Sequence, residues 1–253
     1  MLRLQGYFRK PEPRSVNLDE ALLYHDRAFL RQGNEQMARD LFASKPGHIP
    51  DLESTLTEDK LIVDIACGTG EFSGALAKVY PKNEVLGIDI SKDALKVARR
   101  EYRKVKNLGY QRGDIYELST ILPKKAGLIT ANLALHNFDN LEGAVQQIYQ
   151  SLDEKGAFFF SDLNPEEILK KPALALLYRT RNQLGEDVFV NRFVRPVKER
   201  GNTHAQLDLA LTMSFMASYT KEEIKDALSK SGFKSIKVEP DDTGEALAGY
   251  AIK

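Results

Sequence analysis

A turn of small residues separates a predicted strand from a predicted helix and carries the first residues that could do chemistry. Asp64 lies near the end of that strand, and Ala66, Gly68 and Gly70 lead directly into the helix. Small residues let the backbone approach a ligand closely, and a helix N-terminus presents amide groups that have no intrahelical partner. Roughly 20 residues after Gly70, Asp89 ends a second predicted strand, where an acidic group can accept hydrogen bonds from both hydroxyls of a ribose. The pattern predicts a site for an adenosine-containing cofactor at the carboxyl ends of a parallel sheet.

Two side chains beside this turn indicate the class of cofactor. A dinucleotide site usually reads G-x-G-x-x-G, whereas Ser73 occupies the third glycine position here and Glu71 adds a negative charge at the start of the helix. A glutamate at that place repels a pyrophosphate, and Asp64 adds a second carboxylate nearby. The two carboxylates suit a cationic ligand with an ammonium and a sulfonium. Glu71 and Ser73 disfavour the alternative of a nicotinamide dehydrogenase.

This stretch resembles motif I of the class I S-adenosylmethionine-dependent methyltransferases, whose pattern is acidic-x-Gly-x-Gly-x-Gly. The motif is matched from Asp64 to Gly70, with Ala66 in the first glycine position. The resemblance runs continuously over residues 61–163 and resumes over residues 219–253. It implies that the cofactor is S-adenosylmethionine.

The resemblance also implies roles for the residues at the ends of the first two strands. Asp64 would hold the amino group of the methionine part of the cofactor, often through water. Gly68 and Gly70, together with Ala66, would line the methionine and the ribose. Asp89 would bind the two ribose hydroxyls.

Residues further along the chain complete the site that the resemblance implies. Ile90 would pack on the adenine, and Asp114, in the Gly-Asp-Ile sequence after the third strand, would accept a hydrogen bond from the adenine amino group. Ile115 would pack on the face of the same ring. Asn132 and Leu133 end the fourth strand and would support the methionine part.

Methyl transfer requires alignment of the nucleophile with the methyl carbon and the sulfur, and a base if the nucleophile is protonated. His136 follows the fourth strand, and its neutral imidazole could take the proton of a phenol or an enol near pH 7. The alternative is that this histidine serves packing or loop structure. Residues 132–135 lack the polar-Pro-Pro-aromatic quartet of enzymes that methylate amino groups of nucleobases or glutamine, which disfavours that subclass. No metal site is indicated, because His25, His48 and His204 show no cluster spacing with cysteine or carboxylates.

Short apolar runs alternate with amphipathic stretches through the middle of the chain. The runs predict strands at residues 61–66, 84–89, 108–112, 126–133 and 156–162, and the stretches between them predict helices at residues 71–80, 91–106 and 141–152. Near-continuous apolar strands that alternate with helices indicate a parallel sheet covered by helices on both faces.

The last part of the chain returns to the same rhythm. Thr220 and Glu223 form a capping box at the start of a helix over residues 220–231, and strands at 233–239 and 246–252 then form an antiparallel pair. With these two strands, the resemblance implies an α/β fold with a Rossmann-like seven-stranded, mostly parallel sheet.

Four parts are expected along the chain. Residues 1–60 form an N-terminal arm and helices that contribute to a lid, 61–163 the S-adenosylmethionine-binding core, 164–218 a helical cap insertion, and 219–253 the helix and strand pair that complete the core. The insertion is far longer than an ordinary connection of ~2–6 residues. Its aromatic and arginine side chains suit an amphiphilic or anionic acceptor; the alternative is ordinary core residues and a solvated helix face.

The composition narrows the class of protein. The chain has 253 residues with 36 basic and 36 acidic side chains, a balance that argues against a protein that coats nucleic acid. Cys67 is the only cysteine, which excludes an intramolecular disulfide framework and indicates that the protein resides in a reducing compartment. We interpret Cys67 itself, which lies beside the cofactor turn, as a small packing residue. No apolar run reaches the ~18–20 residues that span a membrane, and the first residues lack the apolar region of a signal peptide, so we expect a cytoplasmic protein.

We therefore expect an enzyme that moves a methyl group from S-adenosylmethionine to an oxygen or carbon atom of a small molecule. The alternatives are an RNA or protein methyltransferase, for which neither a basic tail nor an appended binding domain is visible, and a non-catalytic scaffold that binds the cofactor without turnover. The sequence leaves open the acceptor, the atom methylated, the use of a general base and the oligomeric state.

Overall fold

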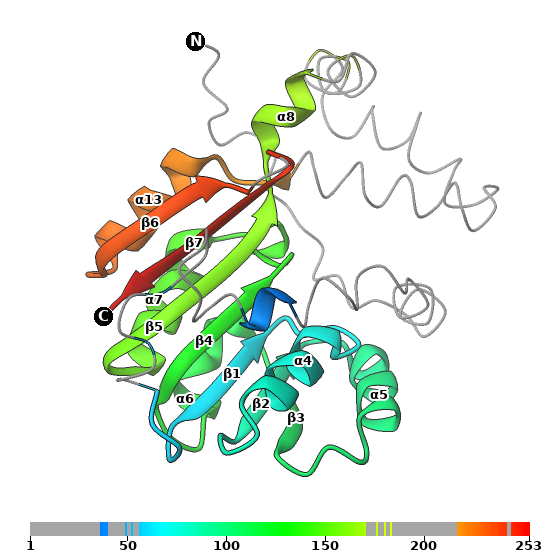
Figure 1. The fold of residues 1–253 in the computed structure, drawn as a ribbon. Helices are drawn as coiled ribbons and strands as arrows, with labels where there is room; N and C mark the ends of the chain where they lie inside the picture. The colour runs from blue at the N-terminus through cyan, green and yellow to red at the C-terminus, as the bar shows by residue number, and fades with distance from the viewer. Residues whose placement is uncertain are drawn as a thin grey trace, which may run out of the picture.

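The computed structural model describes residues 36–39, 49, 52, 56–170, 176, 180, 183, 217–241 and 244–253. Within them, seven strands form one sheet in the order β3-β2-β1-β4-β5-β7-β6 (Figure 1). The strands are β1 (Leu61–Ile65), β2 (Val85–Asp89), β3 (Leu108–Arg112), β4 (Ala126–Asn132), β5 (Leu152–Leu163), β6 (Lys234–Pro240) and β7 (Ala246–Ile252). The helices are α4 (Glu71–Val79), α5 (Lys92–Glu101), α6 (Leu118–Ile121), α7 (Leu141–Ser151), α8 (Pro165–Lys170) and α13 (Lys221–Lys230), with short 3-10 helices η1 (Ile115–Glu117) and η2 (Leu135–Asn137).

Most of the sheet is parallel, as the sequence predicts. The four strand pairs β1–β2, β1–β4, β2–β3 and β4–β5 are parallel, whereas β7 pairs antiparallel with both β5 and β6. Helices α4 and α5 lie on one face of the sheet, and α6, α7 and α13 lie on the other (Figure 1). The predicted α/β fold with a seven-stranded, mostly parallel sheet and helices on both faces is confirmed.

The central strands β1 and β4 and the middle of β5 are buried on both sides because both faces of the sheet are covered. Three successive residues of β5 show this: Phe158 and Phe160 join the core on the side of α7 and α13, while Phe159 joins the core on the side of α4. All three side chains are at most 2% exposed. This explains why residues 157–160 of β5 form a continuous apolar run that does not alternate with polar residues.

The helix caps at two element starts agree with the sequence. The side chain of Ser91 accepts a hydrogen bond from Ala94 N at the start of α5. At the start of α13, both halves of the capping box between Thr220 and Glu223 are present. Such caps satisfy amide groups that have no partner inside the helix.

Two element boundaries differ from the expectation by more than one residue. The predicted helix over residues 91–106 ends at Glu101, where the ring of Tyr102 lies so close to Gly74 that a Cβ there would be 2.2 Å from Tyr102 Cε1. After that point Asn107 Nδ2 donates to three backbone carbonyl oxygens at the ends of α4 and the following turn, which fixes the chain before β3. These contacts form between segments far apart in the sequence, so helical periodicity alone does not reveal the earlier end.

The fifth strand begins earlier than predicted. Its first residues, Leu152 to Lys155, are mostly polar and read as a turn, yet the strand starts at Leu152 directly after α7. Lys155 has a φ of 62°, and the register with β4 shifts between Ala126 and Leu128. The strand therefore contains an irregularity that the sequence pattern alone reads as a boundary.

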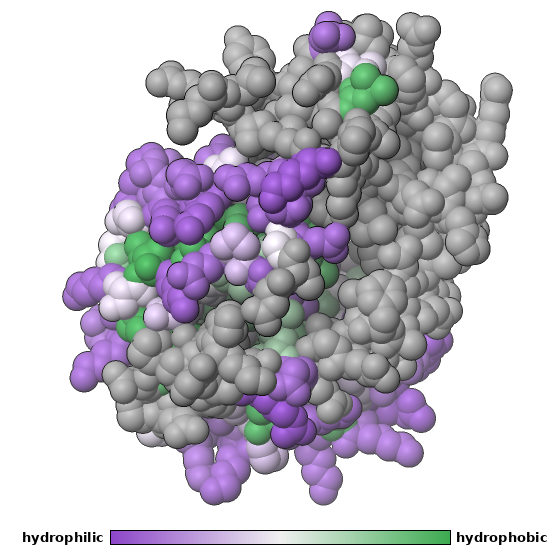
Figure 2. Space-filling view, turned by 45° about the horizontal axis from the view of Figure 1, so that its top comes forward, coloured by the Kyte–Doolittle hydropathy of each residue, from purple (hydrophilic) through white to green (hydrophobic). Residues whose placement is uncertain are grey.

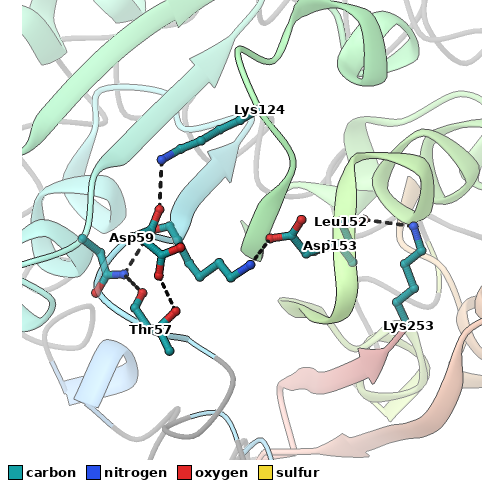
Figure 3. Close-up of polar contacts among 8 residues, drawn as sticks. Thr57, Asp59, Lys124, Leu152, Asp153 and Lys253 are labelled. Atoms are coloured by element: carbon teal, nitrogen blue, oxygen red, sulfur yellow. Dashed lines mark hydrogen bonds and ion pairs between the residues drawn. The ribbon is translucent and has the colours of Figure 1, made fainter.

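The amino ends of the parallel strands carry lysine contacts (Figure 3). Lys60 Nζ lies 2.7 Å from Asp153 Oδ2, and Lys253 Nζ donates to Leu152 O at 2.9 Å. Lys124 Nζ donates to the backbone oxygen of Asp59 at 3.0 Å. We call the region formed by these residues the amino edge of the sheet.

On the face that Figure 2 shows, the described residues are largely hydrophilic, with smaller apolar areas between the charged side chains. The edge strand β6 contributes Lys237 and Glu239, whose charged groups lie 3.2 Å apart. Charged side chains on an edge strand oppose pairing with another chain. Among the described helices, none has the length and apolar character needed to cross a bilayer.

Parts of the expected lid and cap lie outside the described residues. Of the predicted arm and helices over residues 1–60, the structure describes a helical segment at residues 36–39, where Ala38 is buried. Of the predicted cap over 164–218, it describes α8 and four further helical positions. Residues 184–216 of the predicted cap lie outside the described residues.

Candidate active site

The predicted cofactor residues gather at one edge of the sheet, which we call the carboxyl edge. The strands β3, β2, β1 and β4 are neighbours and run parallel, so the residues that follow them meet at this edge. The chain order of the strands reverses between β1 and β4, and ligands of open α/β sheets bind in the crevice outside such a point. The sites predicted after four different strands therefore belong to one region.

The turn after β1 has a strained backbone. Ala66, Gly68 and Gly70 have φ values of 51°, 54° and 86°, which is the left-handed region. A Cβ on Gly70 would lie 2.3 Å from Tyr110 Oη, so the turn packs tightly against β3 at that residue. A Cβ on Gly68 would meet no atom within 4 Å, so open space adjoins the turn there. Gly70 is thus required by packing, while Gly68 leaves its backbone accessible to a ligand.

Asp89 connects the end of β2 to this turn. Its Oδ2 accepts a hydrogen bond from Gly68 N at 2.8 Å, and its Oδ1 accepts one from Ser91 N at 2.7 Å. Asp89 is only 9% exposed, and this burial raises the pKa of its carboxyl group. Each carboxylate oxygen can accept more than one hydrogen bond, so Asp89 keeps acceptor capacity beyond the two amides.

Asp64 lies beneath the turn and is 1% exposed. Ser73 Oγ of α4 donates to its Oδ2 at 2.6 Å, and Thr130 Oγ1 of β4 donates to its Oδ1 at 2.8 Å. Burial raises the pKa of Asp64 to about 7. From the sequence, Ser73 was recognised only as a departure from the dinucleotide pattern, and Thr130 was not selected. Thr130 could have been identified because it is a hydroxyl residue inside an otherwise apolar strand.

Glu71 and Cys67 are the other two side chains of the turn that the sequence singled out. Thr69 Oγ1 donates to the Glu71 carboxylate, with distances of 2.8 and 2.7 Å to its two oxygens, which holds this negative charge at the first turn of α4. Cys67 is buried, and burial raises the pKa of its thiol. A buried thiol that resists deprotonation is a poor nucleophile, in agreement with a packing role.

The residues expected around the adenine follow β2 and β3. Gly113 N donates to Asp89 O at 3.1 Å, which joins the ends of these two strands. Asp114 Oδ1 accepts from Tyr116 N at 3.0 Å and caps η1. Ile90 and Ile115 are partly buried, and Ile115 packs against the larger core cluster. The structure thus brings Ile90, Asp114 and Ile115 to the same edge as Asp89.

The end of β4 resembles the turn after β1 in its backbone. Leu133 has a φ of 52° and is 39% exposed, and its N donates to Ser161 O of β5 at 2.7 Å. This left-handed residue ends the strand after Asn132, one residue earlier than predicted. Non-glycine residues in this conformation concentrate at functional sites because the surrounding structure must hold them there.

His136 lies in η2, and its contacts involve a residue that the sequence analysis did not select. His136 Nδ1 lies 2.6 Å from Asp162 Oδ1, and His136 N donates to Asp162 Oδ2 at 2.8 Å. On the other side of the ring, Nε2 lies 3.2 Å from Asn137 Nδ2. Asp162 ends a predicted strand in the same way as Asp64 and Asp89, which is the signal that could have identified it.

The sequence predicts no metal site at the other three histidines. His25, His48 and His204 lie outside the described residues. Within the part of the chain that the structure describes, no group of three or more histidine, cysteine or acidic residues could hold a metal ion.

The comparisons with known proteins agree with this fold. The chain is 30% identical over 111 residues to a malonyl-[acyl-carrier protein] O-methyltransferase of Halalkalibacterium halodurans, covering 43% of this chain and 41% of the relative. It is 25% identical over 118 residues to a demethylmenaquinone methyltransferase of Leptospira interrogans, covering 46% and 47%. The chain thus spans less than half the length of either relative.

A solved structure shows the same architecture over nearly the whole chain. The plantazolicin methyltransferase BamL, in complex with a triazolic desmethylPZN analog and SAH, superposes with a TM-score of 0.62 at 17% identity over 92% of this chain and 89% of that one. In addition, residues 56–232 match the family model described as a methyltransferase domain. Because that match covers more than half of the sequence, the chain belongs to the methyltransferase-domain family.

Proposed function

We propose that this protein transfers the methyl group of S-adenosylmethionine to an oxygen or carbon atom of a small molecule. The observation that carries the proposal is the contact between Asp89 and Gly68 N at 2.8 Å. It places a carboxylate with spare acceptor capacity directly beside the open space at Gly68, within a fold of this family.

The residues present fit the chemistry of this cofactor. The open space at Gly68 can receive a ligand close to the backbone, and Asp89 can accept from ribose hydroxyls. Glu71 adds a negative charge at the start of α4, which favours the cationic methionine part over a pyrophosphate. Asp114 and Ile115 follow β3, where the resemblance implies the adenine.

Asp64 would act on the methionine ammonium through an intervening group. Its two oxygens accept from Ser73 and Thr130, and its 1% exposure favours the water-mediated form of the contact over a direct one. Asn132 and Leu133 would support the methionine part from β4.

The bound cofactor supplies a methyl group on a positively charged sulfur. The chain supplies alignment, because the strained residues at the ends of β1 and β4 fix the backbone on both sides of the crevice. His136 would take the proton from an acceptor that carries one, such as a phenol or an enol.

We further propose that the acceptor is amphiphilic or anionic. The relatives are named for a malonyl group on an acyl carrier and for a demethylated menaquinone, which fit these two classes. The single cysteine and the balanced charge support a reducing, cytoplasmic location and a small-molecule acceptor over a nucleic acid.

Calorimetry with S-adenosylhomocysteine tests the cofactor site. Asp89→Ala removes the proposed ribose contact, and charge-assisted hydrogen bonds are worth ~1.5–3 kcal/mol, so the affinity should fall ~10–100-fold. Asp153→Ala, which removes a carboxylate at the amino edge, is the matched control and should leave the affinity unchanged. Equal affinity in wild type and a folded Asp89→Ala protein would contradict the ribose assignment.

A second experiment separates an enzyme from a binding scaffold. The protein is incubated with S-adenosylmethionine carrying a deuterated methyl group and with a panel of phenols, enols and carboxylic acids that includes a demethylated quinol. Mass spectrometry should find the label in one acceptor class. Binding of the cofactor without label transfer to any member would favour the non-catalytic scaffold.

A further inference from the structure

The pair formed by His136 and Asp162 joins two adjacent strand ends. His136 lies just after β4, and Asp162 lies within β5, which pairs with β4. Three donors point at the Asp162 carboxylate: His136 N at 2.8 Å, His136 Nδ1 at 2.6 Å and Leu163 N at 2.7 Å. An ionised carboxylate accepts and does not donate, so it is the form that satisfies all three contacts.

The contacts on the two ring nitrogens agree on one tautomer of His136. Nδ1 faces the carboxylate and therefore carries the hydrogen. Nε2 faces Asn137 Nδ2 at 3.2 Å, and an amide NH₂ only donates, so Nε2 presents its lone pair. Asn137 is exposed, and its contact with Nε2 marks the outward side of the ring. The nitrogen that could act as a base thus faces away from the buried carboxylate.

The burial of Asp162 indicates a role beyond holding the loop. Its side chain is 3% exposed and that of His136 is 8% exposed. Burying a charged group is costly unless it is paired. The amide of His136 alone would fix η2 through Oδ2, whereas Oδ1 contacts the ring nitrogen in addition to the amide of Leu163. A carboxylate in this place stabilises the imidazolium that forms when the ring takes a proton.

We propose that Asp162 is a positioning residue for His136: it holds the ring in the tautomer whose Nε2 lone pair can take a proton from a hydroxyl or enol acceptor. The proposal rests on the proposed methyl transfer. For a hydroxyl acceptor, the O–H proton passes to Nε2 as the oxygen forms a bond to the methyl carbon. The sulfur–methyl bond breaks with its electron pair remaining on sulfur, and the imidazolium later releases its proton to water.

The test combines one measurement on the wild type with three variants. Two-bond ¹⁵N–¹H correlation spectra of histidine-labelled wild type report the tautomer directly. Asp162→Asn removes the charge while keeping the shape, and Asp153→Asn at the other end of β5 is the matched control. His136→Ala is made alone and combined with Asp162→Asn, and turnover is measured with a phenol methylated in the panel above.

If Asp162 acts through His136, the wild-type ring carries its hydrogen on Nδ1. Asp162→Asn should lower kcat roughly 10- to 100-fold, with KM and the affinity for S-adenosylhomocysteine changed by less than about twofold. In the His136→Ala background the same change should have no further effect on kcat, because the residue it acts through is gone. Asp153→Asn should retain the wild-type rate.

Three results would overturn the proposal: a wild-type ring protonated at Nε2, unchanged kcat in Asp162→Asn, or an equal loss of kcat with and without His136. If Asp162→Asn does not fold, the wild-type tautomer still decides. Failure of the proposed function is distinct, since wild type would then neither bind S-adenosylhomocysteine nor transfer a methyl group, whatever the tautomer.

Discussion

At the amino edge of the sheet, the carboxylate of Asp153 pairs with Lys60 and is partly exposed, whereas at the carboxyl edge the carboxylates of Asp64, Asp89 and Asp162 are buried. Their hydrogen-bond donors are two hydroxyls, backbone amides and one imidazole. Among the described residues, no lysine or arginine forms an ion pair with these three aspartates.

This difference shows how the two edges use negative charge. At the amino edge, lysine neutralises an acidic group, so little negative electrostatic potential remains there. Neutral donors at the carboxyl edge satisfy the aspartate oxygens and bring no compensating positive charge, so the aspartates that are ionised there favour a positively charged ligand. The same contrast explains why changes of similar chemistry should have different consequences at the two edges.

Removal of the imidazole at the carboxyl edge should give the largest effect. If His136 is the general base, His136→Ala should lower kcat ~10²–10⁴-fold for a phenol acceptor while leaving the affinity for S-adenosylhomocysteine nearly unchanged. Steady-state kinetics and calorimetry on the same preparation measure both quantities. A folded variant that retains most of its rate would falsify the general-base role and would mean that His136 serves packing or loop structure.

Asp64 should make stability depend on pH. Burial raises its pKa to about 7 in the folded protein, so between about pH 4 and pH 7 the folded state holds a proton that the unfolded state releases. The contribution is fully present below about pH 4 and is lost as the pH rises through 7, at up to ~1.4 kcal/mol per pH unit. Asp64→Asn should remove this dependence.

Urea unfolding of wild type and Asp64→Asn at pH 5 and pH 7.5 measures the effect. The free energy of unfolding of the variant relative to wild type should increase by about 2–4 kcal/mol between the two pH values. Asp153→Asn serves as the control and should show no such increase. A constant difference between Asp64→Asn and wild type would mean that Asp64 is ionised throughout this range.

The two glycines of the turn should separate packing from ligand access. Gly70→Ala places a Cβ against Tyr110 at a φ of 86°, so the free energy of unfolding should fall by about 1–3 kcal/mol. Gly68→Ala meets no atom within 4 Å and should cost less stability, yet it fills the open space beside the turn and should weaken S-adenosylhomocysteine binding. Thermal unfolding and calorimetry distinguish the two; a Gly68→Ala protein with unchanged affinity would place the ligand elsewhere.

The smallest effect is expected at the amino edge. Lys60→Met removes an ion pair whose side chains are 33% and 28% exposed, and such pairs contribute ~0–1 kcal/mol. Cofactor affinity and kcat should remain at wild-type values. A large loss of either would show that the amino edge is coupled to the carboxyl edge and that the two edges do not differ in the way proposed.

Much of the fold could be predicted because its signals are local. The local sequence predicts the conformation of several segments directly: the apolar run Leu61–Ile65, the capping box at Thr220 and the small residues from Ala66 to Gly70. The parallel order then brings the predicted residues Asp89 and Asp114 to one edge. These features depend on neighbours in the sequence and on general rules of sheet topology.

The partners of the key side chains could not be predicted in the same way. Thr130 reaches Asp64, and Asp162 reaches His136, only because β4 lies between β1 and β5. The early end of α5 similarly depends on the contact of Tyr102 with Gly74. Each of these contacts joins segments far apart in the sequence, so periodicity and capping signals do not predict them.

A side-by-side calorimetric titration of the wild-type protein with S-adenosylmethionine and NADH tests the central claim most directly. Both titrations use the same buffer and ionic strength, because salt screens the charges on which the discrimination depends. A carboxyl edge with uncancelled negative charge should bind S-adenosylmethionine at least ~100-fold more tightly than NADH, which is a difference of about 2.7 kcal/mol. Comparable affinities, or tighter binding of NADH, would contradict the account.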